Sequence, residues 1–193
     1  MSNIFLKLSV ITILLFSIAN AENSDELSKR VQKKISVVMD LLKDDALQKE
    51  QRERKILSEI EVLFDYKLIS RLSLGKVWKS FDKKKREEFT EKFTKKLKHS
   101  YLEKVRLYTD EKVEFVEPKQ TKENRIEMIS YIVGKNDKKE VLYKFHKSKS
   151  RGWLIYDLEI EGVSILRTYR SQFAAELKNG SIDTLLEKLC DQC

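Results

Sequence analysis

The residues that could do chemistry are few and lie far apart in the sequence. Asp157 and Glu159 alternate along one face of a predicted strand and would suit acid–base work. A solvated strand face explains this pair more simply, because acidic side chains are rarely buried. The histidines, His99 and His146, fall on polar sides of their segments, and Ser171 has no base near it in the sequence. No serine-hydrolase, zinc-protease, phosphate-loop or dinucleotide-binding motif is present. We therefore expect a protein that is not an enzyme and uses no cofactor.

Cys190 and Cys193 form a C-x-x-C pair within the last four residues. A redox-active pair places its attacking thiol at a helix N-terminus, where the helix dipole lowers the thiol pKa. Here the pair follows a predicted helix, Ser181–Leu189, and a zinc site would find only the two histidines as further ligands. We expect a local disulfide formed in an oxidising compartment, and no metal site. Two free thiols on a frayed tail are the alternative.

The first 21 residues, MSNIFLKLSVITILLFSIANA, predict a secretory signal peptide. They carry one cation, Lys7, then an apolar run from Leu8 to Ile18 and a small-residue Ala19–Ala21 ending. The run is shorter than the roughly 20 residues that a membrane-spanning helix needs. We expect cleavage after Ala21 to leave residues 22–193 as one domain, with an uncleaved N-terminal anchor as the alternative.

The charge balance favours an anionic counterpart. Residues 1–21 contain only Lys7 among charged residues, so the predicted mature chain has 38 basic and 31 acidic residues, a net charge of +7. In an exported protein the counterparts we expect are anionic lipid head groups or an acidic protein surface, and no nucleic acid. Simple solvation of lysine-rich faces such as Lys83–Glu88 is the alternative.

The first half of the chain has helical periodicity. The predicted helices are Ser24–Lys43, Gln48–Phe64, two short helices within Phe64–Phe81 bent around Leu74 and Gly75, and Asp82–Tyr108, for which Asp82 is the expected N-cap. The last of these helices carries an apolar ridge with steps of four residues, formed by Phe89, Phe93, Leu97, Tyr101 and Val105. Steps of four drift around a helix of 3.6 residues per turn, so the ridge could line a concave wall. A ridge that is simply core is the alternative.

The second half changes to a period of two, which is typical of strands. Short polar turns join four predicted strands in the pattern of an antiparallel meander, Lys112–Pro118, Arg125–Gly134, Glu140–Lys147 and Gly152–Ile160. We expect two helices to follow, Val163–Lys178 and Ser181–Leu189. The fold class is therefore α+β, with a helical layer packed on a four-stranded antiparallel twisted sheet. The space between the layers is either packed solid or open for a ligand.

The alternation of side chains also predicts strand faces. Val141, Tyr143 and Phe145 share one face of the third strand. In the fourth strand we expect one set to point inward and Asp157 and Glu159 to point outward; the inward set is Leu154, Tyr156, Leu158 and Ile160. The second strand is apolar on both faces, which favours cover on both sides and leaves its buried face open.

Three stretches together resemble the MlaC family, also called the toluene-tolerance auxiliary family. They are FDYKLISRLSLGKVWKSF (Phe64–Phe81), the phenylalanine ridge with Tyr101 behind it, and WLIYDLEIEGVSILRTYRSQF (Trp153–Phe173). Members of this family are periplasmic phospholipid-binding components of the maintenance-of-lipid-asymmetry ABC transport system. The terminal Cys190–Cys193 pair is not part of the family pattern, so no lipid role is attached to it.

The resemblance implies a monomeric periplasmic carrier of glycerophospholipid. Such a carrier moves lipid between an inner-membrane ABC transporter complex with MCE domains and an outer-membrane lipoprotein complex, and so maintains outer-membrane lipid asymmetry. The acyl chains would lie in an apolar pocket between helices and sheet. We expect this pocket to be lined by Leu72, Leu74, Trp78, Phe89, Phe93, Leu97, Tyr101, Tyr143, Phe145, Tyr156, Leu158, Val163, Leu166, Tyr169 and Phe173.

Two arginines, Arg71 and Arg170, match patterned arginines of the family. We expect them to hold the fold or the pocket rim by pairing with acids such as Asp157, with direct phosphate contact as the alternative. Two other classes of protein stay open. One is a binding protein for another hydrophobic ligand, such as a hydrocarbon or solvent, and the other is a structural or interaction module without a ligand.

Overall fold

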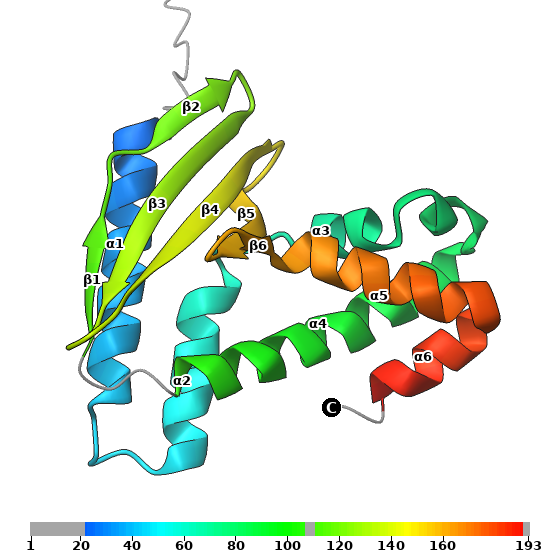
Figure 1. Ribbon diagram of the computed structural model, residues 1–193, viewed down its shortest axis with the longest axis horizontal. Coiled ribbons are helices and arrows are strands. Elements are labelled where there is room, and N and C mark those ends of the chain that lie inside the picture. Colours follow the sequence, from blue (N-terminus) through cyan, green and yellow to red (C-terminus); the bar gives the residue numbers. More distant parts are fainter. Residues whose placement is uncertain (1–21, 107–110, 191–193) are drawn as a thin grey trace, which may run out of the picture.

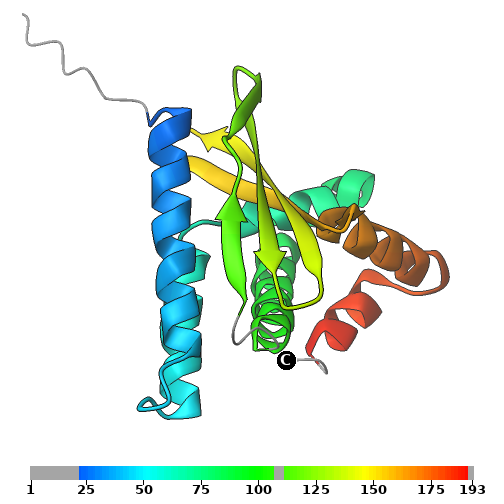
Figure 2. The same ribbon diagram turned by 60° about the vertical axis from the view of Figure 1, so that its left-hand side comes forward.

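The computed structural model describes residues 22–106 and 111–190. The predicted signal peptide and Cys193 lie outside these residues. Helices pack on a twisted antiparallel sheet, which confirms the predicted α+β class (Figure 1). Helix α1 lies along one face of the sheet, α4 runs below the sheet from beside α2 toward α6, and α5 and α6 extend beyond the β6 edge (Figures 1 and 2).

Four α-helices and a 3-10 helix precede the sheet. They are α1 (Ser24–Leu42), α2 (Lys49–Glu61), α3 (Tyr66–Leu74), the 3-10 helix η1 (Gly75–Ser80) and α4 (Lys83–Val105). The predicted N-cap is confirmed, because the Asp82 carboxylate accepts a hydrogen bond from the Lys85 amide at 2.8 Å. The predicted bend is also present. Gly75 has φ +56°, which ends α3 and starts η1.

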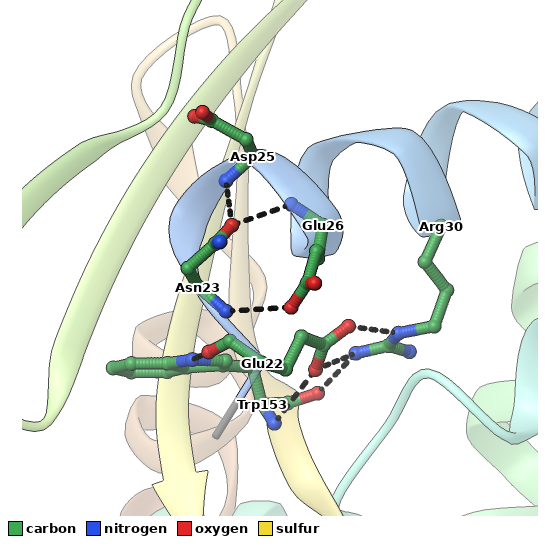
Figure 3. A network of polar contacts seen from close by, with 6 residues as sticks. All are labelled: Glu22, Asn23, Asp25, Glu26, Arg30 and Trp153. Carbon is green, nitrogen blue, oxygen red and sulfur yellow. Dashed lines mark hydrogen bonds and ion pairs between the residues drawn. The ribbon is translucent and has the colours of Figure 1, made fainter. Parts of the chain in front are cut away.

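Helix α1 is fastened to the sheet at its first turn (Figure 3). Asn23 and Glu26 form a capping box, in which the Asn23 side chain accepts from the Glu26 amide at 2.9 Å and the Glu26 carboxylate accepts from the Asn23 amide at 3.1 Å. The indole of Trp153 donates to the Glu22 carbonyl oxygen at 2.8 Å, and Arg30 bridges the Glu22 carboxylate and the Trp153 carbonyl oxygen. The start of α1 is therefore held against the sheet by polar contacts as well as by apolar packing.

The sheet has six strands, two more than predicted. They are β1 (Lys112–Phe115), β2 (Lys119–Lys122), β3 (Arg125–Val133), β4 (Lys138–Ser148), β5 (Gly152–Ile160) and β6 (Val163–Ser164). The spatial order is β1-β3-β4-β5-β6, and β2 also pairs with β3. The sequence pattern missed β2 because all four of its residues are exposed, so no alternation of apolar and polar side chains marks it.

A β-bulge in β5 overturns part of the predicted strand faces. Lys144 pairs with Asp157 and Phe145 with Ile155, so Tyr156 is an extra residue without a partner of its own. The inserted residue reverses the parity of the strand: Trp153 and Ile155 belong to the core on one side of the bulge, and Leu158 packs against it on the other. The prediction that Tyr156 points inward with Leu158 is therefore wrong, while Leu154 is buried as predicted, 1% exposed, but lies outside the main core cluster.

A β-hairpin separates β5 from the helix that follows it, whereas the sequence predicted that the helix follows this strand directly. Ile160 pairs with Val163 across a two-residue turn in which Glu161 has φ +49° and Gly162 has φ +74°. Positive φ at both central residues is the geometry that matches the twist of paired strands. Helix α5 (Ile165–Asn179) therefore begins two residues after the predicted start, and α6 (Ile182–Cys190) follows it.

Candidate functional site

The aromatic ridge of α4 meets the aromatic side chains of α5. The Phe173 ring lies with its centroid 5.4 Å from that of Phe89 and 5.0 Å from that of Phe93, edge to face in both cases. The Phe93 ring is also 4.9 Å from Tyr169. Phe81 continues the cluster at 5.9 Å from Phe89. Two segments that the sequence places some 80 residues apart thus form one aromatic cluster.

Side chains of the sheet belong to the same buried cluster. Tyr143 and Phe145 on β4 are buried and stack with centroids 6.4 Å apart. The Tyr143 hydroxyl lies 3.0 Å from the Ser130 hydroxyl, so the buried polar atom is satisfied within the sheet. Burial raises the pKa of Tyr143 to about 12, a rise that the Ser130 hydrogen bond only partly offsets. The phenol therefore stays neutral at physiological pH.

Most of the predicted lining residues belong to this one core. The buried ones are Leu74, Phe89, Phe93, Leu97, Tyr143, Phe145 and Phe173. Trp78, Tyr101, Leu158, Leu166 and Tyr169 are half-buried and pack against them. Leu72 is half-buried and outside the cluster.

Two predicted lining residues lie elsewhere. Tyr156 sits on the opposite face of the sheet, where Arg125 lies 5.0 Å above its ring and His146 meets its edge. The bulge in β5 places it there. Val163 is 61% exposed on the edge strand β6, because the hairpin turn directs it outward.

Several core residues were not predicted as lining. Trp153 and Ile155 were missed because the bulge reversed the strand parity on which the prediction relied. Others come from α1, β3 and α6: Leu27, Val31, Ile126, Met128, Leu185, Leu186 and Leu189. Helical spacing gives α1 and α6 apolar faces, but spacing alone does not say which face meets the ridge.

A cleft of about 1040 Å³ opens beside the core, between α3, η1, α4 and the ends of β3 and β4. Its lining is mostly polar: Asp65, Lys67, Leu68, Arg71, Trp78, Lys83, Arg86, Glu87, Thr90, Glu91, Thr94, Lys95, Lys98, Asn124, Arg125, His146 and Lys147. Of the residues predicted for the apolar pocket, Trp78 is the one that lines it. Arg71, predicted for the rim, also lies in its wall.

Asp65 connects the cleft to the fold. Its carboxylate receives the Leu68 amide at 2.9 Å, capping α3, and lies 2.9 Å from Nε2 of His146. The Asp65 amide donates to the Ile155 carbonyl oxygen at 3.0 Å, which joins the α2–α3 linker to β5. The hydrogen bond with His146 is the largest effect on the pKa of Asp65, which lies below its usual value. Asp65 is therefore an ionised carboxylate at neutral pH.

The predicted pairing of the arginines with Asp157 is wrong. Asp157 is buried, 7% exposed, and accepts hydrogen bonds from the Ser164 hydroxyl at 2.8 Å and the Leu166 amide at 3.0 Å. The nearest cation to it is Lys144, with 4.0 Å between Nζ and the carboxylate. Asp157 therefore fastens the start of α5 to β5, a role that the sequence pattern of a solvated strand face did not reveal.

Arg170 instead lies at the C-terminal end of α3. A Cβ atom placed on Gly75 would be 3.0 Å from the Arg170 guanidinium, so the glycine permits this close approach. A cation at this end of a helix is favoured by the helix dipole. This supports a structural role for Arg170, while Arg71 faces the cleft.

Residues 22–106 and 111–190 contain no group of three or more histidine, cysteine or acidic residues placed to hold a metal ion. Across the same residues, none of the helices combines the length and the apolar character needed to span a membrane. The predicted Cys190–Cys193 disulfide includes residues outside the described side chains and stays a prediction.

Comparison with known proteins assigns the chain to a family. The family model described as MlaC protein matches residues 32–191. The intermembrane phospholipid transport system binding protein MlaC of Haemophilus influenzae is 28% identical over 120 residues, 60% of this chain and 56% of that protein. The match thus spans little more than half of that relative.

The fold has a counterpart among solved structures. The phospholipid-binding protein from Ralstonia solanacearum, solved in complex with a phospholipid, superimposes with a TM-score of 0.75 at 19% identity, over 90% of this chain and 97% of that chain. Since the family model covers most of the sequence, the chain belongs to the MlaC family.

Proposed function

We propose that this protein is a monomeric phospholipid carrier of the periplasm and not an enzyme. It receives and delivers glycerophospholipid between an inner-membrane ABC transporter complex with MCE domains and an outer-membrane lipoprotein complex, and so maintains outer-membrane lipid asymmetry. The observation that carries the proposal is the meeting of the α4 ridge with Tyr169 and Phe173 of α5, in the same buried cluster as apolar side chains of the sheet. The names of the Haemophilus and Ralstonia relatives support the choice of ligand.

The apolar region suits acyl chains by position and by chemistry. It gathers apolar side chains from α4, α5, β4 and β5 into one buried cluster. Lipid uptake requires these elements to move apart so that methylene groups replace contacts between aromatic rings. Each such ring pair contributes about 0.5–1.5 kcal/mol, which is small beside the free energy of sheltering an acyl chain from water.

Transfer must be direct. A diacyl lipid hides on the order of 30 methylene groups at about 0.8 kcal/mol each, or roughly 25 kcal/mol in all. Release of free lipid into water is therefore negligible. The protein must pass lipid to a docked partner, so it needs a docking surface and a mouth in addition to the apolar region.

Native mass spectrometry of residues 22–193, purified without detergent, tests the proposal. We expect an added mass of one glycerophospholipid, identified after organic extraction. In a second test, protein stripped of lipid should take up lipid from vesicles. A tryptophan substitution at Leu97, which narrows the apolar region, should lower lipid retention, while tryptophan at the exposed Val62 should leave it unchanged.

Other outcomes identify the alternatives. An extracted hydrocarbon in place of lipid would indicate a binding protein for other hydrophobic ligands. A clean apo mass with no uptake from vesicles would mean that the apolar region is only a core, as in a structural or interaction module.

A further inference from the structure

The cleft beside the core carries more positive charge than its own acids neutralise. Eight of its lining residues are lysine or arginine and three are aspartate or glutamate, an excess of five positive charges. The acids are already paired inside the cleft. Their pairs are Asp65–His146, Glu87–Lys83 and Glu91–Lys95.

Of the other cations, Lys98 pairs with Glu61, which is not a lining residue. The last five have no carboxylate partner among residues 22–106 and 111–190: Lys67, Arg71, Arg86, Arg125 and Lys147. Two of the arginines are held in place by neutral groups. Arg86 donates to the Trp78 carbonyl oxygen at 3.0 Å and lies 5.5 Å above the indole ring. Arg125 donates to the Asn124 carbonyl oxygen at 2.9 Å. Carbonyl oxygens and rings orient a guanidinium without cancelling its charge, and its other N–H groups stay available to an anion.

This arrangement suits a phosphate group. A concave surface lined by charges of one sign focuses the electrostatic potential, and guanidinium groups match the geometry of phosphate oxygens. Lysines on the neighbouring walls add positive charge, and their flexible side chains can contact a phosphate in more than one orientation.

The cleft also adjoins the apolar region. Trp78 lines the cleft and packs against the hydrophobic core, so one side chain contacts both. A molecule with an anionic head and an apolar tail can therefore fill both places at once. The acidic surface of another protein could pair with the cations, but it has no apolar tail to bury in the core.

We propose that the cleft receives the phosphate-bearing head group of the bound phospholipid while the acyl chains enter the core beyond Trp78. Because the uncompensated charge exceeds what one phosphate needs, the protein prefers lipids of net negative charge, such as phosphatidylglycerol, over zwitterionic ones. This inference rests on the proposed function and adds a head-group preference to it.

A double variant isolates the charge. Lys67→Gln with Arg71→Gln removes two exposed cations from the α3 wall. Arg54→Gln with Lys55→Gln removes the same two charges from exposed positions on α2, outside the cleft, and is the matched control. Thermal unfolding of all three proteins checks that the fold is kept.

The assay is lipid choice. Apo protein is incubated with vesicles of equal phosphatidylglycerol and phosphatidylcholine, recovered, and its bound lipid is extracted and measured at low and high salt. We expect the wild type and the control to enrich phosphatidylglycerol. The cleft variant should lose roughly three- to tenfold of that enrichment with its total lipid unchanged, and high salt should lower the wild-type enrichment.

Four results would overturn the inference. Bound lipid that mirrors the vesicles in the wild type, or enrichment that survives in the cleft variant, leaves the carrier function standing and removes the head-group role. Unchanged enrichment together with weaker binding of the cleft variant to vesicle surfaces would assign the cations to membrane approach instead. A wild-type protein that takes up neither lipid contradicts the carrier function itself.

Discussion

The Asp65 carboxylate lies 2.9 Å from Nε2 of His146 and at the same time caps α3 through the Leu68 amide. One side chain thereby joins a helix start, the end of β4 and the wall of the cleft. Since Asp65 also follows the segment that pairs with β5, it marks the place where the helical layer is fastened to the sheet.

Replacing Asp65 by asparagine should lower the free energy of unfolding at pH 7 by about 1–2 kcal/mol, because asparagine can still cap the helix but removes the charge opposite His146. The pKa of Asp65 is lowered in the folded state, so its contribution is present above the ordinary aspartate pKa and is lost as the pH falls through the lowered value. Urea unfolding between pH 7 and pH values below about 4 measures this. A difference between wild type and variant that stays constant over this range would contradict the assignment.

Gly162→Ala should destabilise the protein by about 1–2 kcal/mol, because an alanine Cβ is unfavourable at a φ of +74°. No atom lies within 4 Å of the place a Cβ would take, so the cost comes from the backbone and not from a clash. Gly162→Asn is the control, since asparagine tolerates this conformation, and should recover most of the loss. Equal thermal midpoints for the alanine variant and the wild type would show that the turn is not under this constraint.

Asp157 and Ser164 should prove energetically coupled, while Asp157 and Arg170 should not. Double-mutant cycles with alanine at each position, measured by urea unfolding, test both pairs. For Asp157 and Ser164 we expect a coupling of about 0.5–3 kcal/mol, because the Ser164 hydroxyl donates to the buried carboxylate. For Asp157 and Arg170 the effects should add to within about 0.5 kcal/mol. A large coupling in the second cycle would restore the ion pair that the sequence suggested.

Trp153→Phe should expose the start of α1 to hydrogen exchange. The substitution keeps an aromatic ring but removes the indole donor to the Glu22 carbonyl oxygen, at a cost of about 1–3 kcal/mol for the acceptor left without its partner. Amide exchange in the first turn of α1 should rise, while exchange in α4 should stay as it is in the wild type. Trp78→Phe is the control, because Trp78 is half-buried and lines the cleft. It should leave amide exchange in the first turn of α1 unchanged.

Local patterns predicted much of the fold. The helix N-cap at Asp82, the bend at Gly75 and the ridge of Phe89, Phe93 and Leu97 depend on spacing and on backbone preferences that act within a few residues. The family resemblance, confirmed by the family model, rests on motifs of the same local kind.

The errors have a different origin. Tyr156 points away from the core because of a bulge that depends on pairing with β4, and β2 forms from residues whose exposed side chains carry no periodic signal. Asp157 is buried because β6 and the start of α5 fold over it. None of these can be read from one segment, because each depends on which neighbour the segment meets.

The sequence by itself determined the order and type of the main elements, the apolar ridge and the family, since periodicity and short motifs are properties of neighbouring residues. Only the tertiary structure decided which side chains meet. In the folded protein the α4 ridge packs against Phe173, and Asp157 accepts a hydrogen bond from Ser164 instead of pairing with Arg170. Arg71, Arg86 and Arg125 line one cleft. The physical reason is that packing, strand register and charge pairing act between segments far apart in the chain, and their outcome is set only when the layers come together.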